Sequence, residues 1–350
     1  MRAPFFSIVM PVLNGGRAFE QCLDAVARSG FRDWELIVVD DGSSDASVVL
    51  AASHGARVLA TKGRQGPAAA RNLGSEAAVG RFLFFLDADC EVHPDTLERA
   101  AHHLEADPGL DALFGSYDVS PTAPGLVSQF KNLLHHFVHQ SGAERATTFW
   151  AGCGVVRRET FLRLEGFDAG LFPRPSIEDI ELGYRMTAVG VRILLAKDVQ
   201  VRHHKRWTLG GLIRTDVMDR GIPWTRLMLA NRVRRRELNL NRTGRWSVWL
   251  LGVFAGACGL AFADVAWAFL ALAALLAIIA LNHQVYRFFH QQRGWAFALA
   301  VIPLHVLYYG YSALAFAAGG VCHLAARRDR VRGRANSPGA SENEGRNPED

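Results

Sequence analysis

The sequence predicts an α/β protein in which a mostly parallel sheet is flanked by helices and is followed by an α-helical membrane region. Three observations support this prediction. Apolar segments of strand length alternate with segments of helical periodicity between residue 6 and about residue 104. The central apolar run, residues 82–86, stops at two carboxylates, Asp87 and Asp89. Nearly all long uncharged runs lie after Trp246, so the first 240 or so residues read as an ordinary soluble domain.

The alternating segments are short and well separated. Runs with no turn-forming residue predict strands at 6–12, 34–39, 57–60 and 81–86, and helical spacing predicts helices at 19–27, 44–50, 67–79 and 94–104. This βαβα order predicts parallel strands, right-handed crossovers and helices on both faces of the sheet. The run at 82–86 is apolar throughout, which is typical of a strand buried on both faces.

Beyond residue 110 the pattern is less regular. Strands are expected at 110–119, 191–196 and 199–201, and an amphipathic helix at 126–138. The stretch 150–156 is rich in small residues, so its backbone is expected to approach another group closely. Ser176 is expected to cap a helix whose first turn carries Glu178 and Asp179, where acids complement the helix dipole.

The apolar mass of the chain lies at its C-terminal end. Residues 209–245 mix large apolar residues with arginines, which suits helices in the headgroup plane of a membrane or, equally, helices packed on the soluble domain. Two spans are expected at 246–263 and 265–281, joined as a hairpin with Asp264 at the far surface, and a third or re-entrant segment at 295–326. The domains are therefore placed at 1–208, 209–245, 246–326 and 327–350, the last being a basic and then disordered tail.

The charge pattern and the cysteines indicate which partners and which cellular location to expect. The net charge of +5 gathers in basic clusters, two of which flank apolar runs, so anionic lipid headgroups are favoured over nucleic acid as the partner. The five cysteines have no paired spacing, which argues against disulfides and against a zinc site. The N-terminus lacks the features of a signal peptide. A multi-pass protein of the inner membrane with a cytoplasmic catalytic domain is expected.

Polar motifs follow the predicted strands at one rim of the sheet. The first strand ends in Pro11-Val12-Leu13-Asn14, the second in Asp40-Asp41-Gly42-Ser43 and the central one in Asp87-Ala88-Asp89. The carboxyl ends of parallel strands share one crevice, where ligands of open α/β sheets bind. Alternate carboxylates there could hold a divalent cation and the phosphate oxygens that it bridges.

Together with Gly66-Pro67-Ala68-Ala69-Ala70-Arg71-Asn72-Leu73-Gly74 and Glu178-Asp179, these motifs resemble those of family 2 glycosyltransferases of the GT-A fold, over residues 5 to about 210. The resemblance implies that Asp41, with Asp40, holds the uracil or ribose of a nucleotide sugar and that Arg71 braces the nucleotide. It places Asp87 and Asp89 at the diphosphate and its Mg²⁺ or Mn²⁺, with Asp89 the direct ligand. It makes Asp179 the general base, a task that Glu178 could share.

The chain departs from the family pattern at three places. Asn14-Gly15-Gly16 stands where many members have Asn-Glu. The Gln-x-x-Arg-Trp motif of processive enzymes is reduced to Arg206-Trp207, inside His203-His204-Lys205-Arg206-Trp207. That segment could place His203 on the metal and Arg206 on the diphosphate, or it could be a basic surface patch. The membrane part is short, which favours a single-transfer enzyme over a processive one.

The residues expected to bind the nucleotide sugar are Pro11, Asn14, Asp40, Asp41, Gly66, Arg71, Asn72, Asp87, Arg206 and Trp207, and the expected metal ligands are Asp89, Asp87 and His203. The leading hypothesis is a metal-dependent, inverting hexosyltransferase that moves a sugar from a nucleotide diphosphate sugar to a lipid or lipid-linked acceptor at the cytoplasmic membrane face. The alternatives are a synthase of a short extracellular glycan and a non-catalytic nucleotide-binding membrane scaffold.

Overall fold

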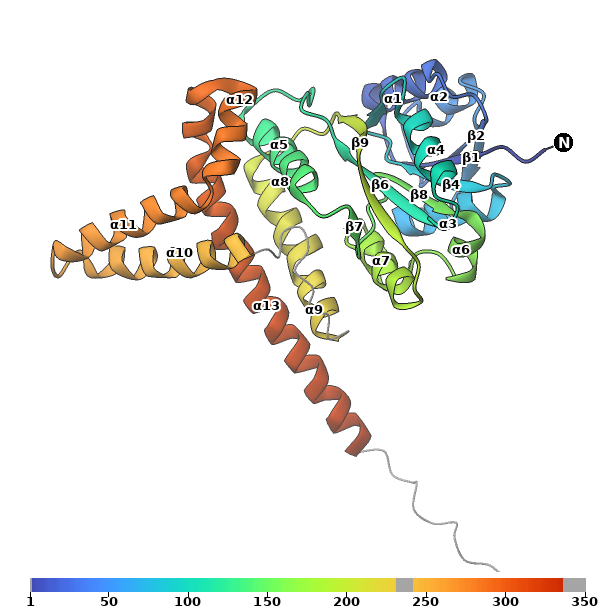
Figure 1. Ribbon diagram of the computed structural model, residues 1–350. Coiled ribbons are helices and arrows are strands. Elements are labelled where there is room, and N and C mark those ends of the chain that lie inside the picture. Colours follow the sequence, from blue (N-terminus) through green and yellow to red (C-terminus); the bar gives the residue numbers. More distant parts are fainter. Residues whose placement is uncertain (1, 231–241, 336–350) are drawn as a thin grey trace, which may run out of the picture.

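A computed structural model of the protein describes residues 2–230 and 242–335, with side chains as far as Arg328. Figure 1 shows an α/β domain from which the C-terminal helices extend as a separate helical region. In the described part of the chain the strands form one sheet in the order β3-β2-β1-β4-β8-β6-β9-β5, with β7 paired to β9. The strands are β1 (Phe6–Val12), β2 (Trp34–Asp40), β3 (Arg57–Ala60), β4 (Phe82–Leu86), β5 (Cys90–Val92), β6 (Ala112–Tyr117), β7 (Arg145–Ala146), β8 (Cys153–Arg157) and β9 (Ile193–His203).

The helices of the α/β domain alternate with these strands. They are α1 (Gly16–Arg28), α2 (Ser47–Ser53), α3 (Pro67–Ala77), α4 (Thr96–Ala106), α5 (Leu126–Ser141), α6 (Arg158–Arg163) and α7 (Glu178–Ala188). The helical region contains α8 (Leu209–Arg214), the π-helix η1 (Thr215–Gly221), α9 (Ile222–Ala230), α10 (Arg242–Leu260), α11 (Ala266–Leu281), α12 (His283–Ala300) and α13 (Ile302–Ala335). The predicted elements of the first 104 residues are therefore all present, with ends that shift by a few residues.

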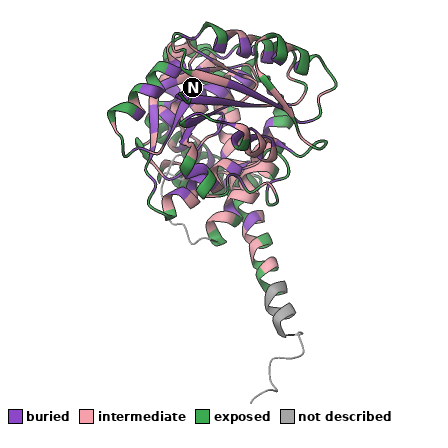
Figure 2. Ribbon diagram, turned by 90° about the vertical axis from the view of Figure 1, so that its right-hand side faces the viewer, coloured by how far each residue is buried: buried purple, intermediate pink, exposed green. Residues whose placement is uncertain are grey.

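The central strand is buried on both faces, as its composition predicts. Phe82, Phe84 and Leu86 belong to one apolar core, together with residues of α1, α2 and α4. Leu83 and Phe85 belong to a second core on the opposite face, with residues of α3, α6 and α7. Figure 2 shows the sheet as a buried layer between more exposed helices. Alternate residues of one strand thus fill two cores, because successive side chains point to opposite faces.

The sheet is mixed, so the expectation of a mostly parallel sheet holds only for part of it. β1 pairs in parallel with β2 and β4, β2 with β3, and β6 with β9, but β8 inserts antiparallel between β4 and β6. β5 and β7 are also antiparallel to β9. The strands predicted at 191–196 and 199–201 are one continuous strand, β9. The parallel half nevertheless places the ends of β1, β2 and β4 on one rim, as the motif argument requires.

Ser176 does not cap α7. The N-cap position belongs to Ile177, and the Ser176 hydroxyl donates instead to the backbone oxygen of Asp219 in η1. Asp45 does receive hydrogen bonds at the start of α2, from the Ser47 amide (3.0 Å) and hydroxyl (2.6 Å). The start of α7 is therefore tied to the helical region rather than closed by its own serine.

The spans predicted at 246–263 and 265–281 become α10 and α11, an antiparallel pair that projects from the rest of the molecule (Figure 1). Among the described residues, no single helix combines the length and apolar character needed to cross a bilayer. The bent pair α11 and α12, with a 66° angle at a short break, meets the length and composition criteria together. The third run, 295–326, is divided at Val301 between α12 and α13, and the cluster 232–236 and the tail 336–350 lie outside the described residues.

We predict that replacing Phe85 by Ala destabilises the α/β domain by about 3–5 kcal/mol, because the change empties a fully enclosed ring site. The Phe85 ring lies 5.1 Å from Phe161, 5.2 Å from Phe167 and 6.4 Å from Phe149, centroid to centroid. Thermal unfolding of the full chain, followed by tryptophan fluorescence, should shift down by on the order of 10 °C. Val79→Ala, at a side chain that is largely exposed, is the control and should leave Tm almost unchanged. Equal shifts in the two variants would contradict this account of the core.

Candidate functional site

One large cavity, of about 1700 Å³, lies at the carboxyl rim of β1, β2 and β4 and extends toward the helical region. The predicted site residues that line it are Pro11, Asn14, Asp41, Gly66, Arg71, Asp87, Asp89, Glu178, Asp179, His203 and Trp207. Asp40, Asn72 and Arg206 do not line it. The structure therefore brings together most of the residues that the motifs single out, from segments that are far apart in the sequence.

Arg71 is the connection between the two acidic parts of the site. Its Nη2 donates to Asp87 at 2.6 Å and its Nη1 to Glu178 at 3.0 Å, and its side chain is 6% exposed. Pro67 occupies the first turn of α3, where its fixed φ suits a helix start, and this helix presents Arg71 to the rim. Arg71 thus joins the end of β4 to the start of α7 through buried, charge-assisted hydrogen bonds.

Asp41 organises the loop that leads into α3. Its carboxylate accepts hydrogen bonds from the amides of Gln65 (2.7 Å) and Gly66 (2.8 Å) and from the Thr61 hydroxyl (2.8 Å). Gly66 has a φ of 88°, and a β-carbon there would lie 2.5 Å from the Pro173 oxygen. Only glycine suits this position, since a side chain would meet both strain and a clash.

Two of the three predicted residues outside the cavity, Asp40 and Asn72, have structural partners. Asp40 accepts from the amides of Gly42 and Ser43 and so shapes the turn after β2. The Asn72 side chain holds the backbone of Phe167, because it donates to the carbonyl oxygen at 2.7 Å and accepts from the amide at 2.9 Å. Arg206 is exposed, while its neighbours His204 and Lys205 line the cavity. Sequence motifs alone do not separate such scaffold contacts from ligand contacts.

Asp179 has the environment of a proton acceptor. Burial and the neighbouring Glu178 charge raise the pKa of Asp179 to about 7, against hydrogen bonds from the amides of Ala151 (3.1 Å) and Ile180 (2.8 Å). Glu178 is differently placed, because its two oxygens are taken by Arg71 and by the Ser176 amide at 2.9 Å. The surroundings of Asp179 therefore suit a proton acceptor, whereas the contacts of Glu178 suit a group that holds its neighbours in position.

Asp89, Cys90 and His203 offer ligand atoms that all lie within 4.8 Å of one another. The Asp89 Oδ2 is 3.5 Å from His203 Nε2. Although burial opposes ionisation, His203 and then Lys205 lower the pKa of Asp89 to about 2, so this carboxylate is charged. Burial raises the pKa of the Cys90 thiol well above its usual value, which makes the thiol a poor ligand.

A contact with Asn132 fixes the orientation of the His203 ring. Asn132 Nδ2 donates to the Ser128 oxygen at 3.0 Å, so its Oδ1 faces His203 Nδ1, at 2.5 Å. Nδ1 therefore carries a proton, and Nε2 points toward Asp89 and toward the Tyr117 hydroxyl, which is 3.3 Å away. An imidazole that donates from one nitrogen to a fixed acceptor is the usual state of a histidine that binds a metal through the other.

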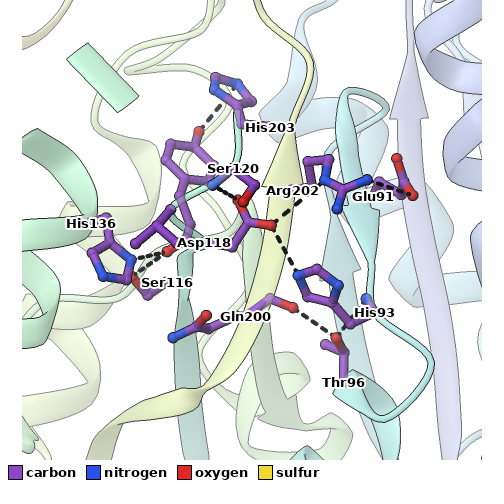
Figure 3. Close-up of polar contacts among 12 residues, drawn as sticks. Glu91, His93, Thr96, Ser116, Asp118, Ser120, His136, Gln200, Arg202 and His203 are labelled. Carbon is purple, nitrogen blue, oxygen red and sulfur yellow. Dashed lines mark hydrogen bonds and ion pairs between the residues drawn. The ribbon is translucent and has the colours of Figure 1, made fainter. Parts of the chain in front are cut away.

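A second polar cluster holds the strands that carry Asp89 and His203 (Figure 3). The Asp118 carboxylate lies 3.1 Å from His93 Nε2 and 3.7 Å from Arg202 Nε. Glu91 lies 3.8 Å from Arg202 and 2.8 Å from His204 Nε2. These contacts tie β5 to β9, so the loop residue Asp89 and the strand end His203 keep their spacing.

Sequence reasoning missed several residues that line the cavity. Tyr117 stacks on His203 with ring centroids 4.2 Å apart, and His135 and Trp150 pack around Tyr117. Burial lowers the pKa of His135 well below its usual value, so this ring is neutral near neutral pH. Tyr117 lies in the strand expected at 110–119, His135 in the helix expected at 126–138 and Trp150 in the stretch 150–156, but none of these patterns tells a core face from a cavity wall.

A GT-A-like sheet whose rim brings Asp41, Asp87 and Asp89 into one cavity with Arg71 of α3 and Asp179 of α7 is the arrangement expected of a nucleotide-sugar glycosyltransferase. Comparison with known proteins agrees. Residues 7–164, somewhat less than half of the chain, match the profile of Glycosyl transferase family 2. This match and the relatives described below support a glycosyltransferase, as the sequence motifs predict.

Among its relatives, glycosyltransferase AglE of Haloferax volcanii is 29% identical over 217 residues, which are 58% of this chain and 68% of that protein. A PGL/p-HBAD biosynthesis glycosyltransferase of Mycobacterium bovis is 36% identical over 121 residues, 33% of this chain and 47% of that protein. This match therefore spans about half of the mycobacterial protein. The solved structure of mannosyltransferase PcManGT from Pyrobaculum calidifontis, in complex with GDP-Man and Mn²⁺, has a TM-score of 0.50 at 20% identity, covering 93% of this chain and 88% of that one. This last likeness shows the fold.

We predict that Arg71→Ala lowers stability by about 3–5 kcal/mol, because it leaves the Asp87 and Glu178 carboxylates without their shared cation. Thermal unfolding of the variant and of the unaltered protein at pH 7 measures this difference. Arg99→Ala, at an exposed pair with Asp95, is the matched control and should cost at most about 1 kcal/mol. A loss in Arg71→Ala no larger than that in Arg99→Ala would contradict the bridge.

Proposed function

We propose that the chain is a metal-dependent, inverting glycosyltransferase that moves a sugar from a nucleoside diphosphate sugar to a lipid or lipid-linked acceptor at the cytoplasmic face of a membrane. The observation that carries the proposal is that Asp89 and His203, which fit a divalent cation, share one cavity with Asp179, whose pKa is about 7. Asp89 and His203 suit the binding of a cation that faces a diphosphate leaving group, and Asp179 suits the role of proton acceptor.

In a direct displacement of the nucleoside diphosphate by the acceptor hydroxyl, these residues have different roles. Asp41 and Gly66 shape the pocket for the nucleoside, and Arg71 holds Asp87 beside the diphosphate position. Bound Mg²⁺ or Mn²⁺, held by Asp89 and His203 with help from Asp87, would neutralise the charge that develops on the leaving diphosphate. Carboxylate oxygens suit both ions, and an imidazole ligand is better suited to Mn²⁺ than to the harder Mg²⁺. Asp179 accepts the proton of the acceptor hydroxyl as it attacks the anomeric carbon.

The membrane part of the proposal rests on the helical region. Large apolar side chains are exposed along α10, α11 and the turn between them, including Trp249, Phe262, Phe269 and Leu272. Phe262 is 97% exposed at the tip of the pair. Extended apolar surfaces of this kind mark membrane or partner contacts. We therefore propose that α10 and α11 insert into the bilayer, with arginines such as Arg242 and Arg245 at its cytoplasmic surface.

Asp179→Asn should reduce turnover by about 10²–10⁴-fold, because the amide cannot accept a proton. Asp89→Asn should reduce it comparably and should weaken the response to added Mn²⁺. The measurement is release of nucleoside diphosphate by purified full chain from a panel of nucleotide sugars, with products identified by mass spectrometry. Asp198→Asn, at an exposed carboxylate paired with His103, is the control and should keep full activity. Full activity in both site variants would refute the mechanism, and absence of nucleoside diphosphate binding would favour a non-catalytic scaffold.

The pH dependence of kcat/KM should report the titration of Asp179. Since its pKa is raised to about 7, the carboxylate is protonated and inactive below that pH and becomes competent above it. Activity should therefore rise tenfold for each pH unit below about 7 and level off above it. A kcat/KM that does not change between pH 5 and 8 would show that Asp179 is not the base.

A further inference from the structure

The cavity is larger than one ligand requires. Binding sites for single ligands usually enclose about 300–1,000 Å³, whereas this cavity measures about 1700 Å³. One end is formed by the sheet rim and contains the residues described above. The other end is walled by η1, α9, α10 and α13, through Trp224, Met228, Val248, Tyr308, Ala313 and Phe316 among others. Arg220 and Arg245 also line this helical end, which combines an apolar wall with two cations and adjoins the proposed donor site.

The helical wall is firmly joined to the glycosyltransferase domain. Trp224 Nε1 donates to the Tyr184 hydroxyl of α7 at 2.9 Å, and the Ser176 hydroxyl donates to the Asp219 oxygen at 2.5 Å. α9 and α13 pack closely, because a β-carbon on Gly319 would lie 2.6 Å from Thr225 Cβ. Figure 1 shows α9 running alongside α13. The apolar end is therefore a built part of the cavity.

A surplus cation lies at the boundary of this apolar wall. The buried Asp216 carboxylate accepts from Lys131 Nζ at 2.7 and 2.8 Å and from the Tyr311 hydroxyl at 2.8 Å, so Lys131 already balances its charge. Arg220 lies farther away, with Nη1 at 3.5 Å from Asp216 Oδ1, and its side chain is 42% exposed. Arg220 thus adds a positive charge and further donors to the cavity lining.

Resting on the proposed glycosyltransferase function, we infer that this end of the cavity binds a lipid phosphate acceptor. Arg220 binds its phosphate, and the hydrocarbon chain lies along Trp224, Met228, Val248 and Phe316. A guanidinium offers paired donors that match phosphate oxygens. A neutral glycolipid would not use the donors that Arg220 adds to the cavity lining, and a free anion would leave the apolar wall exposed to water. The exposed apolar surface of α10 and α11 gives such a lipid a route from the bilayer.

The test measures binding to the full chain in neutral detergent by calorimetry, with farnesyl phosphate, farnesol and inorganic phosphate as probes. Farnesyl phosphate should bind at least tenfold more tightly than either of the others. Arg220→Gln should weaken its binding by about 10–100-fold, as loss of a charge-assisted hydrogen bond predicts, and should leave farnesol binding unchanged. Arg220→Lys should recover part of the affinity. The matched control is Arg226→Gln on α9, at an exposed arginine that does not line the cavity.

Each other outcome overturns the inference. Equal binding of farnesol would remove the role of the phosphate, and equal binding of inorganic phosphate would remove the role of the hydrocarbon wall. An unchanged affinity in Arg220→Gln would show that Arg220 does not bind the phosphate. Binding of UDP and GDP with Mn²⁺ is measured in the same samples. If nucleotides bind while farnesyl phosphate does not, the acceptor inference fails and the proposed function stands; if no nucleotide binds, the proposed function itself fails.

Discussion

The site depends on the bridge from Arg71 to Asp87 and Glu178. Asp87 follows the end of β4 and Glu178 begins α7, about ninety residues later, and a single buried guanidinium holds both within hydrogen-bond distance. Removing water from three charged groups is costly, and it is compensated here only because each charge faces an opposite charge in good geometry. The bridge therefore fixes where α7 begins relative to β4, and with it the position of Asp179.

The same arrangement gives neighbouring carboxyl groups different contacts and different pKa values. Glu178 is paired and serves as an anchor, while Asp179, next in sequence, faces amides and the Glu178 charge and has a pKa of about 7. Asp89 lies beside His203 and has a pKa of about 2. Two carboxylates of one cavity are thus kept in different protonation states near neutral pH. Such divergence is typical of sites in which one acid supports charge and the other moves a proton.

The helical region completes the cavity rather than merely following the catalytic domain. The buried Asp216 receives Lys131 from α5 and Tyr311 from α13, so one carboxylate joins the domain, η1 and the C-terminal helix. The π-helical geometry of η1 lies at this junction. Irregular helices of this kind are frequent at functional sites. The sheet-rim end and the helical end of the cavity are in this way built by different parts of the chain around shared polar contacts.

Much of the site at the sheet rim could be predicted from the sequence. Apolar runs of strand length ending in Pro11, Asp41 and Asp87 determine a parallel rim, because strand periodicity and short connections leave few alternatives. The sequence did not determine the antiparallel insertion of β8, since pairing direction depends on contacts between distant segments. It also did not distinguish Asp40 and Asn72, which hold loops, from Asp41 and Arg71, which face the cavity. Lys131, Asp216 and Arg220 carry no motif, and only tertiary packing, which brings α5, η1 and α13 together, gives them a shared position.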